Sequence, residues 1–283
     1  MQSKIFLANK TVNVRSRLID FSEPKIMGIL NVTPDSFYDG FRYTDEAAMV
    51  NQVEKMIREG ADFIDVGGYS TRPGAAEIPL AEELNRVLPA VKTISKQFPE
   101  IIISIDTFRS AVALQAVESG AGLVNDISGG ERDKEMFSTV ASLNVPYVLM
   151  HSRGTPETMG EQTSYENLLK EIIDYFHQKI SVLHRLGVKD IIVDPGFGFA
   201  KTVKQNFELL NQLAYFQIFG KPIMAGLSRK SLIWRTLKTD PQGALNGTTV
   251  LNTIALVKGA SMLRVHDVRE AYETIQLVNQ LNS

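Results

Sequence analysis

The chain of 283 residues contains no cysteine. This absence excludes disulfide bonds, thiolate metal sites and a cysteine nucleophile, and it removes one argument for secretion. Long apolar runs are missing as well. The first ten residues lack the apolar centre of a signal peptide, and no apolar run approaches the roughly 18 residues that span a membrane. We therefore expect a cytoplasmic protein without membrane contact.

An excess of charge of either sign is also absent. The chain has 30 Lys and Arg residues against 32 Asp and Glu residues, and its formal net charge is −2. This balance gives no indication of a nucleic-acid surface, although charged small molecules remain possible ligands. Hydrophobic residues make up 44% of the chain, which is ordinary for a globular protein that buries a large core.

Short apolar runs alternate along the chain with segments of helical periodicity. The runs occupy residues 26–30, 63–66, 101–105, 123–124, 146–150, 191–193, 222–225 and 262–265. Their continuous apolar character is typical of strands buried on both faces of a parallel sheet. The clearest helical segments are 46–59, 80–97, 110–119, 165–186, 242–258 and 268–281. Four of them end at a glycine, a common helix stop, namely Gly60, Gly120, Gly187 and Gly259.

Eight strand–helix units in a chain of this length predict a (β/α)8 barrel. A doubly wound open sheet is the alternative. Residues 4–7 and 11–14 are separated by the short segment 8–10, and we expect them to form a hairpin that covers the N-terminal mouth of the barrel. No linker or repeat interrupts the chain, so we expect one domain over 1–283, with the hairpin in 1–25 and the barrel in 26–283.

Polar residues follow each predicted strand, at the end where barrel enzymes have their active sites. Taken singly, each is explained as a helix cap or a turn residue. Capping does not require Asn, Lys, Arg and His together at one mouth, however. The residues that suggest chemistry are Asn31, Arg72, Asp106, Asn125, His151, Asp194, Lys230, Arg264 and His266.

These residues divide by charge. Asp106, Asn125 and Asp194 offer acceptors that suit a flat heterocycle with N–H donors along one edge. The cationic residues Arg72, Lys230, Arg264 and His266 suit a phosphate or diphosphate. Asn31 is a neutral oxygen ligand of the kind that binds Mg²⁺ together with a diphosphate. No cluster of His and Asp indicates a zinc site.

Six motifs stand in order at these strand ends, in residues 28–37, 68–74, 125–129, 194–199, 228–231 and 264–266. Through them the sequence resembles the dihydropteroate synthases, a folate-pathway family, over about 26–267. The resemblance implies a homodimer, with the helices 242–258 and 268–281 as candidate contacts. It also implies joining of 6-hydroxymethyl-7,8-dihydropterin diphosphate to p-aminobenzoate, with Mg²⁺ bound through Asn31.

The resemblance further implies roles for individual residues. The pterin ring would be bound by Asp106, Asn125, Ile127, Met150, Asp194, Gly226, Lys230 and Arg264. The diphosphate would be bound by Asn31, Thr71, Arg72, Arg264 and His266. The p-aminobenzoate pocket would consist of Phe37, Thr71, Pro73, Phe197, Arg229, Lys230 and Ser231. Catalysis would involve Asp35, Arg72, Asp106, Lys230 and His266.

Two other functions are compatible with parts of the same pattern. A pterin-binding methyltransferase domain would share Asp106, Asn125 and Asp194, but it would not need the segments 70–74 and 228–231. A non-catalytic pterin-binding homologue would have lost diphosphate ligands that are present here. We also expect the segments 31–43 and 67–79 to close over the diphosphate and complete the second substrate's pocket.

Overall fold

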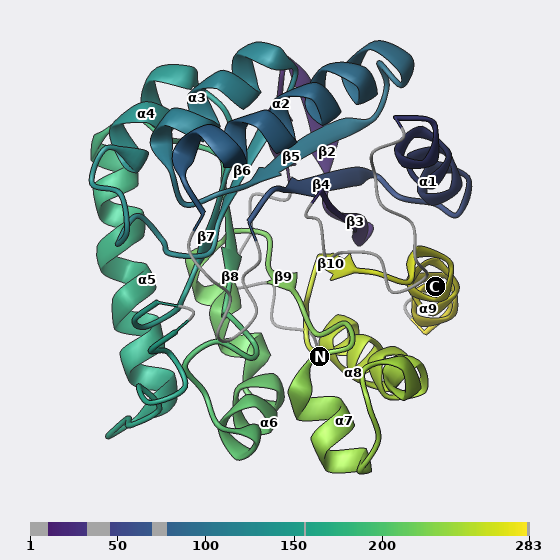
Figure 1. Cartoon of the computed structure of the whole chain (residues 1–283). Coiled ribbons are helices and arrows are strands. Elements are labelled where there is room, and N and C mark those ends of the chain that lie inside the picture. The colour runs from purple at the N-terminus through teal and green to yellow at the C-terminus, as the bar shows by residue number, and fades with distance from the viewer. Residues whose placement is uncertain (1–10, 33–45, 70–77, 156, 282–283) are drawn as a thin grey trace.

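The computed structural model of the chain describes residues 11–32, 46–69, 78–155 and 157–281. Within these ranges eight parallel strands form one sheet in the order β8-β7-β6-β5-β4-β3-β10-β9. The first and last strands of this order also meet, since Val193 and Ile223 form a parallel bridge and the Val193 N–H donates to the Pro222 carbonyl at 2.9 Å. The sheet is therefore closed, which confirms the (β/α)8 barrel and excludes the open sheet (Figure 1).

The barrel strands coincide with the eight apolar runs. They are β3 (Lys25–Asn31), β4 (Phe63–Gly67), β5 (Ile102–Asp106), β6 (Leu123–Asp126), β7 (Tyr147–Met150), β8 (Ile191–Asp194), β9 (Met224–Ala225) and β10 (Met262–Val265). Most of their residues are buried, because one face of each strand fills the barrel and the other packs against the surrounding helices (Figure 1).

The helices form the outer layer (Figure 1). They are α1 (Glu46–Arg58), α2 (Leu80–Gln97), α3 (Ser110–Ser119), α4 (Met136–Leu143), α5 (Leu168–Arg185), α6 (Val203–Asn211), α7 (Ser231–Leu237), α8 (Leu245–Val257) and α9 (Val268–Asn279), with 3₁₀ turns η1 (Leu213–Phe219) and η2 (Gln242–Ala244). In the ranges that the structure describes, no helix combines the length and apolar character needed to span a membrane.

Six helices were expected from periodicity, and three short ones were missed. These are α4, α6 and α7, which have 8, 9 and 7 residues. A helix of two turns shows too few repeats for its periodicity to stand out. A signal existed for α6, because Thr202 and Gln205 form a capping box. The glycine stops are confirmed by positive φ angles of +104° at Gly60 and +132° at Gly120.

The N-terminal hairpin is present, but its strands differ from the expected ones. β1 (Thr11–Val14) pairs antiparallel with β2 (Arg17–Asp20), whereas the expected partner, 4–7, lies outside the described residues. The turn consists of Arg15 and Ser16, with φ of +49° and +65°. Two left-handed residues are what a tight hairpin turn requires. Because neither is glycine, asparagine or aspartate, the sequence showed no turn signal there.

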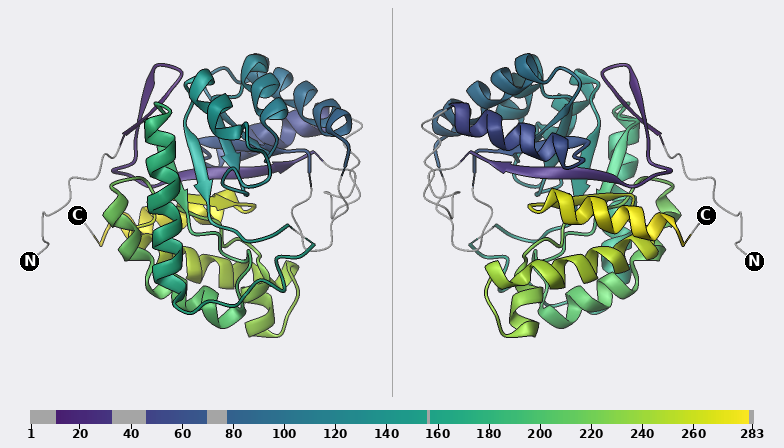
Figure 2. Two further views of the ribbon diagram at one scale, coloured as in Figure 1. Left: turned by 90° about the vertical axis from the view of Figure 1, so that its left-hand side faces the viewer. Right: turned by 90° about the vertical axis from the view of Figure 1, so that its right-hand side faces the viewer.

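The hairpin closes the N-terminal end of the barrel (Figure 2). Val12, Val14 and Phe21 join a buried cluster with residues of the barrel strands, which are Met27, Phe63, Ile102, Leu123, Val148, Ile192, Met224 and Met262. The rings of Phe21 and Phe63 are stacked with their centroids 6.4 Å apart. The centre of this end is therefore filled by apolar side chains, whereas the predicted site residues follow the strands at the opposite mouth.

Replacing Phe21 tests how much this closure stabilises the barrel. Phe21→Ala removes a ring that is 4% exposed, so we expect the free energy of unfolding to fall by about 3–5 kcal/mol in urea denaturation. Leu18→Ala in the same hairpin is the control, since Leu18 is 74% exposed and its loss should cost less than about 0.5 kcal/mol. Equal effects of the two substitutions would show that the hairpin is no part of the core.

Candidate active site

Strand register brings a row of polar side chains together at the C-terminal mouth. Asn31 pairs with Gly67, Gly67 with Asp106, and Asp106 with Asn125, on four neighbouring strands. Paired residues of a parallel sheet point to the same face. A Cβ atom on Gly67 would lie 3.5 Å from Asn31 Oδ1 and 3.6 Å from Asp106 Oδ2. Glycine at this position therefore leaves the space between these two side chains open.

Arg264 on β10 lies between two buried carboxylates. Its Nε atom donates to Asp65 Oδ2 and its Nη2 atom to Asp106 Oδ2, each at 2.6 Å. The division by charge placed Arg264 with the anion-binding residues, opposite Asp106. In the structure its guanidinium is paired with the acidic group, beside which the resemblance also places it as a pterin ligand, and there it offsets the burial of both carboxylates. Its contact with a pterin or a diphosphate stays a prediction.

Asp65 was missed in the sequence, where it stood as a single charge inside the buried run 63–66. It is fully buried, and besides Arg264 it accepts from Asn125 Nδ2 at 2.9 Å. Asp65 Oδ1 and Asn125 Oδ1 are buried without a hydrogen-bond partner. Such atoms cost stability, and they are expected where a ligand supplies the missing donors. With its amide nitrogen bound to Asp65, Asn125 presents its oxygen as a free acceptor.

A second group of polar side chains surrounds Gly226, which follows β9. A Cβ atom on this glycine would lie 3.5 Å from Lys230 Nζ and 3.9 Å from Asp194 Oδ2. Asp194 Oδ1 accepts from the Gly196 N–H at 2.8 Å. Lys230 donates to the Phe197 carbonyl. The structure thus brings Asp194, Gly226 and Lys230 together, as one pterin site would require.

Burial raises the pKa values of the carboxyl groups and lowers that of the lysine, because it disfavours the charged form of each group. Burial raises the pKa of Asp106 to about 7, against the opposing charge of Arg264. Burial also raises the pKa of Asp194, with Lys230 as the main opposing charge. Conversely, burial lowers the pKa of Lys230 to about 8. Shifts of this kind, in opposite directions within one mouth, are typical of functional sites.

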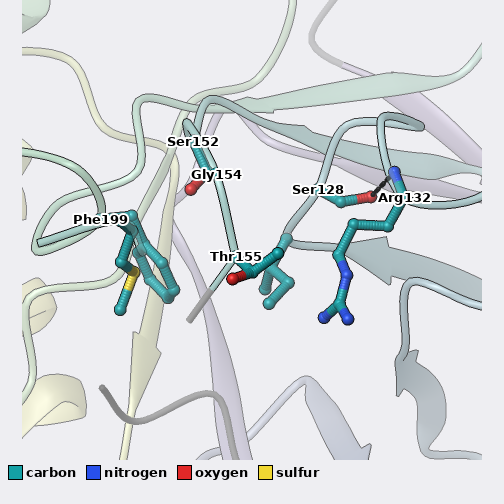
Figure 3. A pocket seen from close by; sticks show the side chains of 8 residues that line it. Ser128, Arg132, Ser152, Gly154, Thr155 and Phe199 are labelled. Carbon is teal, nitrogen blue, oxygen red and sulfur yellow. Dashed lines mark hydrogen bonds between the residues drawn. The ribbon is translucent and has the colours of Figure 1, made fainter. Parts of the chain in front are cut away.

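An apolar cluster borders the polar mouth. Ile127 and Met150 pack with Met159, Phe199 and Ala200. A small pocket opens beside this cluster, with Phe199 on one side and Arg132 on the other (Figure 3), and it is also lined by Ile127, Ser128, Ser152, Gly154, Thr155 and Met159. A flat aromatic ligand bound to the acidic residues would find apolar side chains here.

The predicted p-aminobenzoate residues are not all directed at the mouth. Phe197 is fully buried in the main core. Arg229 forms a two-pronged pair with Asp267, at 2.8 and 2.7 Å, and its Nη1 atom donates to the carbonyls of Pro241 and Gln242, each at 3.0 Å. These contacts make Arg229 a brace between loops. Ser231 begins α7, and Lys230 lies beside Gly226 and Asp194.

His266 and Asn31 stand at the rim. His266 is exposed, and its Nδ1 atom lies 3.2 Å from Ser228 Oγ. Five further predicted site residues lie outside the described ranges, namely Asp35, Phe37, Thr71, Arg72 and Pro73. The predicted loop closure over 31–43 and 67–79 also falls largely outside them. Roles in diphosphate and p-aminobenzoate binding therefore stay predictions.

Comparison with known proteins agrees with this geometry. A family model described as "Pterin binding enzyme" matches residues 27–266. The dihydropteroate synthase of Escherichia coli K12 is 41% identical over 262 residues, covering 92% of each chain. The crystal structure of the Yersinia pestis dihydropteroate synthase with a sulfonamide drug complex superposes with a TM-score of 0.92 at 36% identity, over 96% of this chain and 99% of that one. That of Xanthomonas albilineans with 4-aminobenzoic acid has a TM-score of 0.90 at 35% identity, over 97% and 98%.

The closed barrel and its polar mouth, together with the family match, define a pterin-binding enzyme. Its relatives by sequence and by structure agree on the more specific assignment. The chain belongs to the dihydropteroate synthase family, which confirms the resemblance seen in the motifs. The methyltransferase alternative finds no support among these relatives.

The raised pKa of Asp106 predicts a pH-dependent stability. A carboxyl with a pKa of about 7 in the folded protein, against an ordinary 3.8, binds its proton more tightly when folded. The stabilisation is complete below about pH 4 and is lost as the pH rises to about 7. We therefore expect the unfolding free energy of the wild type to fall relative to Asp106→Asn across this window. The free energy of unfolding of each protein is measured by urea denaturation at several pH values in this window. An equal dependence on pH in the two proteins would contradict the raised pKa of Asp106.

Proposed function

We propose that the site joins 6-hydroxymethyl-7,8-dihydropterin diphosphate to p-aminobenzoate, releasing diphosphate and 7,8-dihydropteroate. The observation that supports this best is the set of buried acceptors at the mouth. Asp106, Asp194 and the unpartnered Asn125 Oδ1 match the N–H and NH₂ donors along a pterin edge. The membership of the chain in the dihydropteroate synthase family agrees with this reaction.

Pterin recognition follows from how these side chains are held. Asp65 orients the Asn125 amide, and the two carboxylates orient the planar guanidinium of Arg264. A guanidinium fixed in this way offers a flat face on which a ring can stack. Ile127 and Met150 supply apolar contacts beside it. Little reorganisation is needed when the ring binds.

The chemical step breaks one bond and forms another at the pterin methylene. The C–O bond to diphosphate breaks with its electron pair on the diphosphate, and the amine lone pair of p-aminobenzoate forms the new C–N bond. The amine then loses a proton to solvent water. Arg72 and His266 stabilise the charge that develops on the leaving group. Asp106 and Asp194 favour cationic character on the pterin methylene, so no protein nucleophile is needed.

Mg²⁺ fits this scheme through Asn31. Among the described residues no group of three His, Cys, Asp or Glu side chains could hold a metal ion alone. Asn31 Oδ1, at the end of β3 beside the open space above Gly67, is a neutral oxygen ligand. Mg²⁺ commonly takes one or two protein ligands and completes its shell with phosphate oxygens and water. When bound, it would neutralise charge on the diphosphate.

We also propose that the protein works in the cytoplasm as a homodimer. The diphosphate ester is highly charged and does not cross membranes, so the enzyme must be where the ester is made. Apolar side chains are exposed along α8, along α9 and just after α9, and a second copy of the chain would cover them. They are Val250, Ile254, Val257, Tyr272, Leu277 and Leu281.

The activity is tested by pyrophosphate release that depends on both substrates and on Mg²⁺. Asp194→Asn should weaken pterin binding and lower kcat/KM by about tenfold to a hundredfold, because a charge-assisted hydrogen bond is lost. Asp174→Asn on α5 is the matched control, since its carboxylate is exposed and pairs with Lys170. Full activity of Asp194→Asn, or release without p-aminobenzoate, would overturn the proposal.

The dimer is tested by light scattering coupled to gel filtration. Val257→Glu places a charge on the exposed apolar surface at the last residue of α8, so the protein should elute with the mass of one chain instead of two. Leu18→Glu on the hairpin is the control, because Leu18 is also exposed but lies outside α8 and α9. A wild type that elutes as a single chain would refute the proposal.

A further inference from the structure

A buried lysine stands directly behind the loop that follows β8. Lys201 is 8% exposed, and its Nζ atom donates to the carbonyls of Gly196 and Phe199, each at 3.0 Å. The same atom lies 3.1 Å from His151 Nδ1. These three acceptors match the three N–H groups of an ammonium. No step of the proposed reaction uses this side chain.

The histidine of this contact is neutral, so its Nδ1 atom is able to accept from the ammonium. Burial, together with the charges of Lys201 and Arg153, lowers the pKa of His151 to about 2, so its ring is neutral. Its backbone N–H donates to the Asp194 carbonyl at 3.0 Å, and its ring packs edge-on against Tyr175 with centroids 4.9 Å apart. His151 therefore gives Lys201 a fixed anchor beside the strand that ends in Asp194.

The loop from 195 to 200 supplies several contacts of the pterin site. The Gly196 N–H binds Asp194 Oδ1, and the Phe197 carbonyl binds Lys230 Nζ. The Phe199 ring lies 4.6 Å from the same Nζ atom. The loop turns sharply, with φ of +73° at Gly196 and +82° at Gly198. Lys201 Nζ links the start and the end of this turning segment through the carbonyls of Gly196 and Phe199.

Burying the ammonium of Lys201 costs desolvation free energy. Burial lowers the pKa of Lys201 to about 7, against the attraction of Asp194, which means that the protein environment resists the charge. An apolar side chain of similar length would avoid that desolvation. The hydrogen bonds to the loop are what an apolar side chain could not supply.

We propose that Lys201 is a positioning residue for pterin binding, whose ammonium holds the 195–200 loop so that Asp194 and Lys230 face the ring. This inference rests on the proposed pterin-binding function. It makes a distinct statement, however, since the Nζ atom acts through the Gly196 and Phe199 carbonyls and through His151. The hydrogen bonds of the ammonium, more than the volume of the side chain, should decide pterin affinity.

The absence of cysteine from the chain makes a direct test possible. Lys201→Cys introduces a single thiol, which is alkylated in denaturant before refolding. Attack of the thiolate on 2-bromoethylamine expels bromide and restores an ammonium at the length of lysine, with sulfur in place of Cγ. Reaction with 1-bromopropane gives a side chain of the same length without charge. Wild-type protein treated in the same ways controls for the procedure.

The readout is the dissociation constant of 6-hydroxymethylpterin, measured by calorimetry, together with the urea midpoint of each adduct. The ammonium adduct should bind within about threefold of wild type, and the propyl adduct about tenfold to a hundredfold more weakly. The propyl adduct should unfold at the same or a higher urea concentration, since it buries no charge. Weak binding with undiminished stability separates positioning from a general packing role.

Equal pterin affinity of the two adducts would overturn the proposal. A propyl adduct that binds pterin weakly but is also less stable in urea than the ammonium adduct would overturn it as well. If the adducts do not refold, Lys201→Met made in cells takes the place of the propyl form, and wild-type affinity in this variant overturns the proposal equally. Failure of the proposed function looks different, because wild-type protein would then bind no pterin at all.

Discussion

The mouth of this barrel depends on the pairing of Arg264 with Asp65 and Asp106. The guanidinium crosses from β10 over β3 to reach carboxylates on β4 and β5, through hydrogen bonds of 2.6 Å. Burying either carboxylate alone would cost several kcal/mol, so each charge is tolerated because the others are present. Asp65 in turn orients Asn125. One ion-pair cluster thereby positions side chains on four strands.

The two ends of the barrel are built from different chemistry. At the N-terminal end the hairpin residues Val12, Val14 and Phe21 complete an apolar cluster that needs no polar partner. At the C-terminal end four of the barrel strands carry Asn31, Asp106, Asn125 and Asp194 at their last or next-to-last position. Stability is concentrated at the closed end, which leaves the open end free to hold unpartnered acceptors at some energetic cost.

Those acceptors lie in a mouth that is partly shielded from water. Burial raises the pKa of Asp106 to about 7 and lowers that of Lys230 to about 8, which leaves both groups sensitive to a bound ligand. Lys201 lies further inside and contacts backbone carbonyls of the loop after β8. Lys201 thus binds the backbone of this loop from the inside, whereas Lys230 is half-buried at the mouth.

The sequence by itself determined the barrel, its eight strands, most of its helices and the family. These features are local: an apolar run or a helix-ending glycine such as Gly60 is recognisable within a few residues, and the motifs are contiguous. The site residues Asp106, Asn125 and Asp194 were found for the same reason, since each directly follows or ends a buried run.

Only the tertiary structure decided which side chains meet. Asp65 and Arg264 are 199 positions apart, and Lys201 and His151 are 50 apart, so no periodicity could reveal either contact. The sequence separated Arg264 from the acidic residues by the sign of its charge, whereas in the folded chain opposite charges that are buried together must pair. The structure pairs 11–14 with 17–20, which the sequence did not indicate because the turn uses Arg15 and Ser16 in left-handed conformations. The packing of Val12 and Val14 beneath the barrel compensates for this turn. Local sequence patterns specify the helices and strands, whereas the burial of residues far apart in the sequence decides which side chains are in contact.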